Sequence, residues 1–344
     1  MAFDADWKVA GYATLPIRFV QGWIFWGGGS RRFIYDPQKL DPHATDWMAN
    51  KFQSAMPGAM FGMEHVIGFM LQHFYLLYTS IILFSLAELI AGVALIAGFC
   101  TRLAAFTTVL ISLVLMLAFG WQGATCMDEW TMAVSTLVMG LTLTLSGASV
   151  YSVDHYIWQR SARLRRHKWF VAIASGPLTM AKLKRVSAIF FIFTVLFTLF
   201  TYNYYRGAIW SSYHAGPVNP REHHLTLSDG RLQSDGSVVF SVDVDAGTPA
   251  EPGHIIRIEL VNQAGKVMAE WNGNALSKLS VDNIKNTFQY NIIQTGPYGL
   301  VAPESAKAAI SLPPSLSRGK LPKGDYVLRL FTISGNQFQL PVHY

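Results

Sequence analysis

Three polar side chains lie inside long apolar stretches of the sequence, where they need a chemical or structural reason. Arg18 and Gln21 fall within the stretch 11–28, and Glu88 falls within 74–99. An ionised group in hydrocarbon costs roughly 3 kcal/mol or more unless it is paired or hydrated. We expect Arg18 and Glu88 to differ in depth by roughly 6 Å, which a long arginine side chain spans. A structural ion pair and a pair whose carboxylate passes on a proton both remain open.

A cysteine in a short polar connection is the candidate nucleophile. Thr125 and Asp128 have the spacing of a capping pair, which predicts a helix start with Cys126 in its first turn. A helix N-terminus favours the thiolate, whereas Asp128 and Glu129 oppose it, so a reactive thiol and an inert small residue both remain open. Cys100 is expected roughly 30 Å or more away, at the other end of a helix, and should not form a disulfide with Cys126.

Two arginines follow a run of glycines. Arg31 and Arg32 come directly after Gly27, Gly28 and Gly29, whose backbone N–H groups predict an anion-binding nest beside the guanidinium groups. The alternative is that both arginines are interfacial anchors that meet lipid phosphates. His65, beside Glu64, is a candidate proton relay or a merely solvated side chain.

Motifs for common cofactors do not occur. His214, His223 and His224 have no further ligands at a metal-binding spacing, and C-x-x-C, C-x-x-C-H, G-x-G-x-x-G and the P-loop are missing. We therefore expect no metal, haem, flavin, dinucleotide or ATP. The net charge of +6 does not indicate nucleic acid, because the Lys and Arg residues cluster beside apolar segments.

The elements that must position these residues are mainly membrane helices. The chain has 344 residues, of which 51% are hydrophobic and only 14% are charged, whereas soluble domains carry about 25% charged residues. Five stretches approach the roughly 20 apolar residues that a membrane-spanning helix needs. They are 11–28, 74–99, 101–121, 128–149 and 186–205. The shorter segments 60–72 and 169–179 are predicted to be interfacial, or for the first an extension of the second span.

Basic residues predict the orientation. Eight Lys and Arg residues between 160 and 185 crowd the connection between the fourth and fifth spans, which places that connection in the cytoplasm. The N-terminus is then cytoplasmic, and the connections 29–60 and 122–127 lie outside with everything after Tyr205. Trp23 and Trp121 fall near the predicted outer boundary, where an aromatic belt is the default explanation.

The sequence after about residue 215 has the texture of β-structure. Short alternating or β-branched runs, such as 237–244, 255–261 and 326–333, are separated by Gly, Asn and Asp turns. Residues 262–265 predict a hairpin turn. We expect an all-β immunoglobulin-like sandwich of two sheets. The predicted fold class is thus a membrane α-helical bundle, with a four-helix core and one anchor helix, followed by this sandwich.

This layout resembles a known family. Four spans with the segment Gly22–Arg32 at the end of the first, followed by an anchored β domain, resemble thiosulfate:quinone oxidoreductase of the DoxD/DoxA type. The expected divisions are 1–180 for the DoxD-like part, 181–210 for the anchor and 211–344 for the DoxA-like part. The four-helix portion is also similar to the functionally mixed DoxX-like group.

The resemblance implies oxidation of two thiosulfate ions to tetrathionate, with electrons passing to a membrane quinone in a prokaryotic plasma membrane. On this basis Cys126, Glu88 and His65 are the expected catalytic residues, Arg31 and Arg32 would bind thiosulfate, and Arg18, Trp23 and Trp121 would contact quinone. A membrane scaffold with a partner-binding β domain and a transporter for a sulfur oxyanion are the alternatives. The sequence does not specify the quinone or whether the chain forms a homo-oligomer.

Overall fold

The computed structural model describes residues 2–123, 128–213, 216–315 and 321–344. Contacts between elements divide the chain into two compact units. The helical unit comprises Met1–Met48, Phe74–Trp121 and Thr125–Gly216, and the β unit comprises Ala49–His73, Gln122–Ala124 and Pro217–Tyr344. The segment 49–73 therefore belongs with the β-strands, although it lies between the first two long helices in the sequence.

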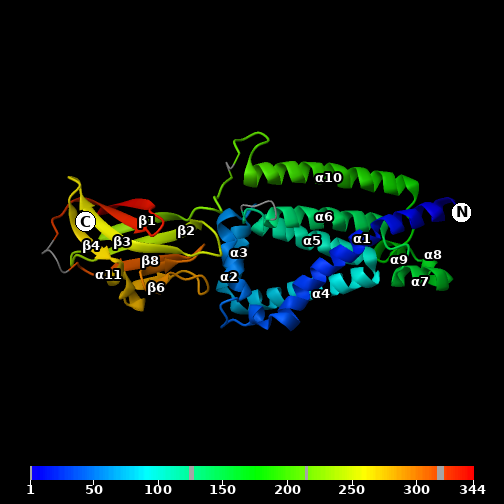
Figure 1. The fold of residues 1–344 in the computed structure, drawn as a ribbon, viewed down its shortest axis with the longest axis horizontal. Coiled ribbons are helices and arrows are strands. Elements are labelled where there is room, and N and C mark those ends of the chain that lie inside the picture. The colour runs from blue at the N-terminus through cyan, green and yellow to red at the C-terminus, as the bar shows by residue number, and fades with distance from the viewer. Residues whose placement is uncertain (1, 124–127, 214–215, 316–320) are drawn as a thin grey trace. The chain divides into compact units, whose positions relative to one another are not determined.

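Five long helices make up the body of the helical unit (Figure 1). They are α1 (Ala2–Ser30), α4 (Phe74–Ala97), α5 (Thr101–Phe119), α6 (Glu129–Ser146) and α10 (Met180–Arg206). Helix α1 packs against α4 and α6, α5 packs against the same two helices, and α10 packs against α6. The four-helix core with one added helix that the sequence predicts is thus the arrangement observed among the described helices.

Three of these helices are long and apolar enough to cross a membrane, namely α4, α5 and α10. In α10 none of the most apolar 18-residue window is buried inside the protein, although its mean hydropathy is 1.9. A surface of this size and apolarity needs lipid or another apolar partner to cover it. Helices α1 and α6 occupy the other two stretches that the sequence predicts to span the membrane.

Shorter helical segments connect the long helices. In the helical unit they are η1 (Arg31–Tyr35, a π-helix), η2 (Pro37–Leu40), α7 (Val153–Arg160), α8 (Ala162–Arg166) and α9 (Lys168–Ile173). Helix α2 (Met48–Ser54), η3 (Met56–Gly58) and α3 (Met63–Gln72) come between η2 and α4 in the sequence and lie almost wholly in the β unit. Helix α3 ends before the non-helical His73, so it does not extend α4.

The β unit contains a ten-stranded mixed sheet in the part of the chain that the structure describes. Its strands are β1 (His224–Leu232), β2 (Val238–Ala246), β3 (Gly253–Asn262), β4 (Val267–Asn272), β5 (Ile284–Asn286), β6 (Gln294–Gly296), β7 (Gly299–Ala302), β8 (Lys307–Leu312), β9 (Asp325–Thr332) and β10 (Gln337–His343). Two short segments, α11 (Gly273–Ser277) and η4 (Val281–Asn283), interrupt them.

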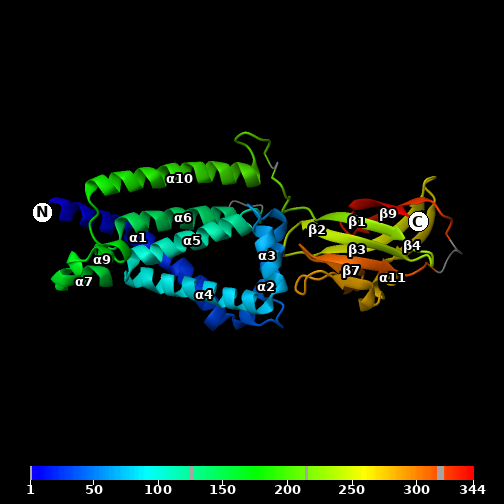
Figure 2. The same ribbon diagram turned by 180° about the vertical axis from the view of Figure 1, so that it is seen from behind.

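The strands follow the order β5-β8-β2-β1-β10-β9-β3-β7-β6, and β4 pairs with β3. The pairing of β1 with β10 is parallel and the other pairings are antiparallel. The prediction of an immunoglobulin-like sandwich is therefore wrong in its architecture. The first and last strands of the sequence, β1 and β10, lie side by side in the middle of this order, and the sheet curls into a nearly closed, barrel-like form around one core (Figure 2).

Alternation along the strands produces that core. In β2 every second residue is buried, including Val238, Phe240, Val242 and Val244, each with no exposed surface. The predicted hairpin is confirmed: β3 and β4 are antiparallel, Gly265 has a φ of 75°, and the Lys266 N–H donates to Asn262 Oδ1 at 2.9 Å. Local turn chemistry is thus readable from the sequence, whereas the closure of the sheet is not.

Candidate functional site

A buried ion pair joins the end of α1 to the middle of α4. Arg32 lies in η1, directly after α1, and its Nη1 donates to Glu88 Oε2. The two side chains are 15% and 7% exposed, so the pair is largely shielded from solvent. Arg32 also donates to Ser85 Oγ at 3.3 Å, and its guanidinium lies 5.9 Å from the centre of the Phe84 ring.

Glycine explains how these two helices approach each other. A Cβ atom at Gly29 would lie 2.6 Å from the Leu89 nitrogen, and one at Gly92 would lie 2.2 Å from the Trp26 nitrogen. Any side chain at these positions would clash with backbone, so the glycines allow the close helix contact. At Gly28 the added Cβ would lie 3.1 Å from Glu88 Oε2, so this glycine leaves room for the carboxylate.

The predicted anion nest is therefore wrong. Gly27, Gly28 and Gly29 are inside α1, where their N–H groups point along the helix to preceding carbonyl oxygens. The free cationic group at this end is the Arg31 guanidinium instead: the residue is exposed, and its side chain makes no ion pair or hydrogen bond among the described residues. Next to it, Ser30 Oγ is buried without a hydrogen-bond partner.

Arg18 does not pair with Glu88, which corrects the sequence-based expectation. Its Nη1 and Nη2 donate to the Val150 and Tyr151 carbonyl oxygens at 3.1 and 2.6 Å. Arg18 and Arg32 are separated by about 20 Å along the helix axis. Glycine contacts set the register of α1 against α4, and that register brings residue 28, not residue 18, beside Glu88. The ends of an apolar stretch in the sequence are too poorly defined to predict this helix register.

A second charged cluster surrounds Asp154, near Arg18. The buried Asp154 carboxylate accepts from the N–H groups of Cys100 and Thr101, at 2.8 and 2.9 Å, and from the hydroxyls of Thr101 and Ser175. Arg102 donates to four backbone carbonyl oxygens. Burial and the Asp154 carboxylate raise the pKa of the Cys100 thiol, which disfavours a reactive thiolate there.

The side chain of Gln21 makes hydrogen bonds to neighbouring helices. Its Nε2 donates to Thr108 Oγ1 and to the Thr136 carbonyl oxygen, at 3.0 and 2.8 Å, and Ser112 Oγ lies 2.9 Å from Thr136 Oγ1. These four buried side chains connect α1, α5 and α6. The buried Gln21 Oε1 is without a partner. The polar residue in the first apolar stretch thus ties the bundle together.

The fourth expected span begins later than its capping motif predicts. Asp128, not Thr125, is the N-cap of α6, and its Oδ1 accepts from the Thr131 N–H at 2.9 Å. Asp128 also pairs with Arg206 at the end of α10. Cys126 lies outside the described residues, so its role stays a prediction.

The three remaining candidate site residues, Trp23, Trp121 and His65, lie in different environments. Trp23 is 52% exposed and packs 4.6 Å from Trp26 between ring centres, as expected for a residue that faces lipid. Trp121 is 1% exposed and therefore belongs to the interior. His65 belongs to the β unit, where its side chain is 87% exposed and lies 3.4 Å from Glu64.

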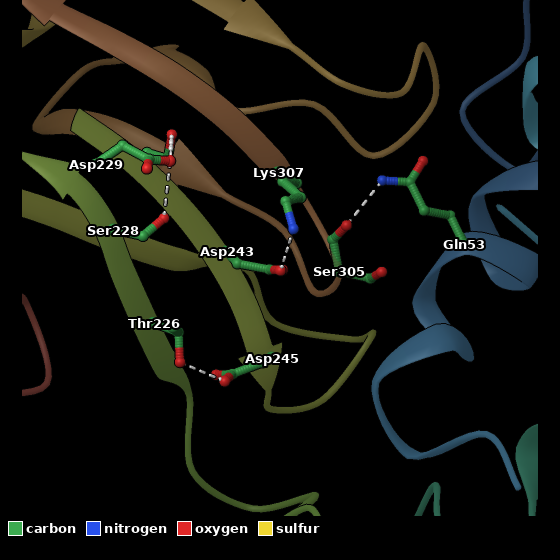
Figure 3. A network of polar contacts seen from close by, with 9 residues as sticks. Gln53, Thr226, Ser228, Asp229, Asp243, Asp245, Ser305 and Lys307 are labelled. Carbon is green, nitrogen blue, oxygen red and sulfur yellow. Dashed lines mark hydrogen bonds and ion pairs between the residues drawn. The ribbon is translucent and has the colours of Figure 1, made fainter. Parts of the chain in front are cut away.

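The β unit contains buried polar residues that sequence reasoning missed. Gln53, fully buried in α2, donates to the carbonyl oxygens of Asn291 and Ser305 at 2.8 and 2.9 Å and accepts from the Asn291 N–H (Figure 3). Glu304 is 1% exposed, neither of its carboxylate oxygens has a partner, and burial raises its pKa to about 9. A Gln in a short helix and a Glu after Pro303 give no sequence signal of burial.

Taken together, the fold and the site define a class: a membrane protein with a bundle of apolar helices, a charged pair buried among them, and a separate β unit. Comparison with protein families then identifies the particular family. Residues 13–184 match the thiosulfate:quinone oxidoreductase small subunit DoxD, and residues 205–340 match the small subunit DoxA. The chain belongs to this family, with the DoxD and DoxA parts fused, as the sequence resemblance predicts.

Among solved structures, the chain was compared with the Pseudomonas fluorescens alkylpurine DNA glycosylase AlkC bound to DNA that contains an abasic site analogue. The identity is 11%, the match covers 96% of this chain and 99% of the other, and the TM-score is 0.19. A TM-score this low indicates no shared fold, so the likeness carries no functional meaning.

Proposed function

We propose that thiosulfate oxidation and quinone reduction meet at the Arg31, Arg32 and Glu88 group of the helical unit. The observation that carries this proposal is an ion pair buried at the end of α1, next to an exposed arginine that has no partner among the described residues. Thiosulfate is a dianion, and guanidinium groups bind such ions through paired N–H donors. Arg31 would capture the ion, and Arg32 would share it.

The overall reaction transfers electrons from thiosulfate to the quinone and also supplies the quinone with protons. Two thiosulfate ions lose one electron each and join through a new S–S bond as tetrathionate, and the quinone takes up two electrons and two protons to become the quinol. When Arg32 turns towards thiosulfate, Glu88 is left as a buried carboxylate without a cation, and such a group is more stable with a proton. Glu88 would then hand that proton to the reduced quinone.

Cys126 is proposed as the sulfur carrier. In this route the thiol and one thiosulfate lose two electrons to the quinone and form the mixed disulfide Cys–S–S–SO₃⁻, while protons go to the quinone oxygens. The second thiosulfate attacks the sulfur that bears the sulfonate, releases tetrathionate and restores the thiolate. His65 is proposed only as a proton relay for the exterior. Glu88 takes the place of Arg18 and Trp121 on the quinone side, and Trp23 stays a candidate quinone contact.

The proposed orientation follows from charge. The described residues between 160 and 185 include eight Lys and Arg residues, which favour the cytoplasmic side of a prokaryotic plasma membrane. The N-terminus is then cytoplasmic and the β unit extracytoplasmic. We retain the division into 1–180, 181–210 and 211–344 as the functional one, with the bundle performing the reaction and the β unit outside the membrane.

Purified full-length protein provides the test. Reduction of a soluble quinone analogue should occur only when thiosulfate is added, and tetrathionate should appear in a one-to-one ratio with quinol. Quinone reduction without thiosulfate dependence, or thiosulfate uptake into vesicles without quinol, would replace this proposal with a scaffold or a transporter. An absorption spectrum of the same sample tests for haem or flavin.

A further inference from the structure

The β unit contains a cavity that has no part in the reaction proposed above. Its volume is about 550 Å³, within the range of about 300–1,000 Å³ that is usual for small-molecule sites. It lies where the segment before β1 meets the end of β2 and the start of β10. A single thiosulfate ion would fill only a small part of it.

The charge of this cavity also excludes the known substrate. Two carboxylates, Glu222 and Asp245, line it, and none of its described lining residues is Lys or Arg, although the whole chain has a net charge of +6. The other polar lining groups include Asn219 and Gln337. An anion would meet repulsion from the two carboxylates, with only the His224 imidazole beside Asp245 to offset it. A positively charged ligand would meet attraction.

The lining is held in place before any ligand arrives. Asp245 Oδ2 accepts from Thr226 Oγ1 at 2.6 Å (Figure 3), and Asp245 Oδ1 lies 2.6 Å from His224 Nδ1. The His224 ring in turn contacts the Phe338 ring edge to face, with 5.4 Å between ring centres. One carboxylate, one imidazole and one aromatic ring are thus fixed side by side, which lowers the entropy lost on binding.

Two further features point to a ligand. The neighbouring His223 lines the same cavity, and its Nε2 is buried without a hydrogen-bond partner. Glu222 is exposed and makes no hydrogen bond or ion pair within the described part of the chain, so its charge is available.

From this geometry we propose that the β unit binds a small organic cation with several ammonium or guanidinium groups, in the cavity lined by Glu222, Asp245 and Phe338. The carboxylates pair with two cationic groups, and the Phe338 ring accepts one of them over its face. Amide side chains take the remaining N–H donors. This binding is independent of the reaction at Arg32 and Glu88 and survives if that proposal fails.

The experiment measures spermidine binding to full-length protein in detergent by isothermal titration calorimetry, with maltose and sodium thiosulfate as comparison ligands. Wild-type protein should bind spermidine with one site per chain, more weakly at higher salt, and should bind neither comparison ligand. Glu222→Gln should weaken spermidine binding on the order of tenfold, the equivalent of about 1.4 kcal/mol for one partly shielded charge pair.

A matched control exists in the same unit. Asp325 pairs with His343 Nδ1 at 2.9 Å, as Asp245 pairs with His224, but it does not line the cavity. Asp325→Asn should leave spermidine binding unchanged, whereas Asp245→Asn should weaken it as Glu222→Gln does. Equal weakening by Asp325→Asn, tighter binding of maltose or thiosulfate, or no spermidine binding by the wild type would each overturn the proposal.

Discussion

Two groups of buried charge in the helical unit differ in how completely they are satisfied. Asp154 accepts four hydrogen bonds, and Arg102 donates to four carbonyl oxygens. Glu88, by contrast, receives its hydrogen bond from Arg32 alone among the described residues. A charged group whose hydrogen-bonding capacity is fully used inside the protein cannot bind a substrate as well. A charged group with a single partner can exchange that partner for a substrate. We therefore assign structure to the first group and chemistry to the second.

The largest expected effect concerns stability at the saturated group. Asp154→Ala leaves two helix-start N–H groups and two hydroxyls without an acceptor in a buried site, so we expect a loss of about 3–5 kcal/mol in the free energy of unfolding. Thermal unfolding in detergent measures it. Turnover per folded molecule should stay at the wild-type value; a catalytic defect in the folded fraction would erase the distinction between the two groups.

A third buried ionisable group, Glu304 in the β unit, sharpens the comparison because neither of its carboxylate oxygens has a hydrogen-bond partner within the described part of the chain. Its pKa is raised to about 9 in the folded chain, against 4.5 for an ordinary Glu, so the folded state keeps a proton that the unfolded state loses between these values. Stability is then highest below pH 4.5 and falls as pH rises towards 9, by about 3 kcal/mol between pH 4.5 and 7.

The measurement for Glu304 is unfolding of the full chain, followed by the circular dichroism of the β-strands at several pH values. Glu304→Gln removes the titration and should flatten the dependence while it raises stability at pH 8. A wild-type curve that rises with pH in this range has the opposite sign and would show that Glu304 is ionised and paired.

At the Arg32–Glu88 pair, we expect substitution to lower turnover rather than stability. Glu88→Gln keeps the shape and removes the proton carrier, so we expect thiosulfate-dependent quinone reduction to fall by about 100-fold or more, as is usual for loss of a general acid. The midpoint of thermal unfolding should change little. Ser85→Ala, which removes the 3.3 Å bond to Arg32 and the bond from Ser85 to the Ile81 carbonyl oxygen within α4 but keeps the Arg32–Glu88 pair, is the control and should retain most activity.

The smallest effect is expected at the exposed arginine. Arg31→Ala should raise the KM for thiosulfate by about fivefold to tenfold, because one charge-assisted contact in a partly hydrated site contributes about 1 kcal/mol. Steady-state kinetics at constant ionic strength measure this change. Arg32→Ala differs because it also leaves the Glu88 carboxylate without its ion-pair partner. An equal effect of Arg31→Ala and Arg32→Ala on the KM would therefore argue against separate roles for the two arginines.

Local patterns in the sequence predicted much of the fold. Apolar runs located the helices of the bundle, and alternation with the turn at 262–265 located the strands and the β3–β4 hairpin. The parallel pairing of β1 with β10 joins segments about 110 residues apart, and no local pattern encodes that pairing. The grouping of 49–73 with the strands depends on Gln53 and Asn291, whose contact joins residues 238 apart in the sequence.

The site was predicted in its residues but not in its pairing. Arg32 and Glu88 were both candidates, yet Glu88 was assigned to Arg18, because depth was reckoned from the ends of apolar stretches. Close helix contacts at Gly22, Gly29 and Gly92, which have no side chain, determine the helix register instead. Of these, Gly29 also belongs to the run 27–29 from which the sequence predicts an anion nest, since a glycine run has the same pattern whether it forms a turn or a helix contact.

The central claim is that the Arg32–Glu88 pair acts in the reaction and not only in holding α1 to α4. Exchanging the two residues, Arg32→Glu with Glu88→Arg, restores an ion pair of opposite direction, so thiosulfate-dependent quinone reduction by the folded double variant is the most direct measurement. The account predicts thermal unfolding close to the wild type and activity about 100-fold lower. Recovery of wild-type turnover in the exchanged pair would contradict it.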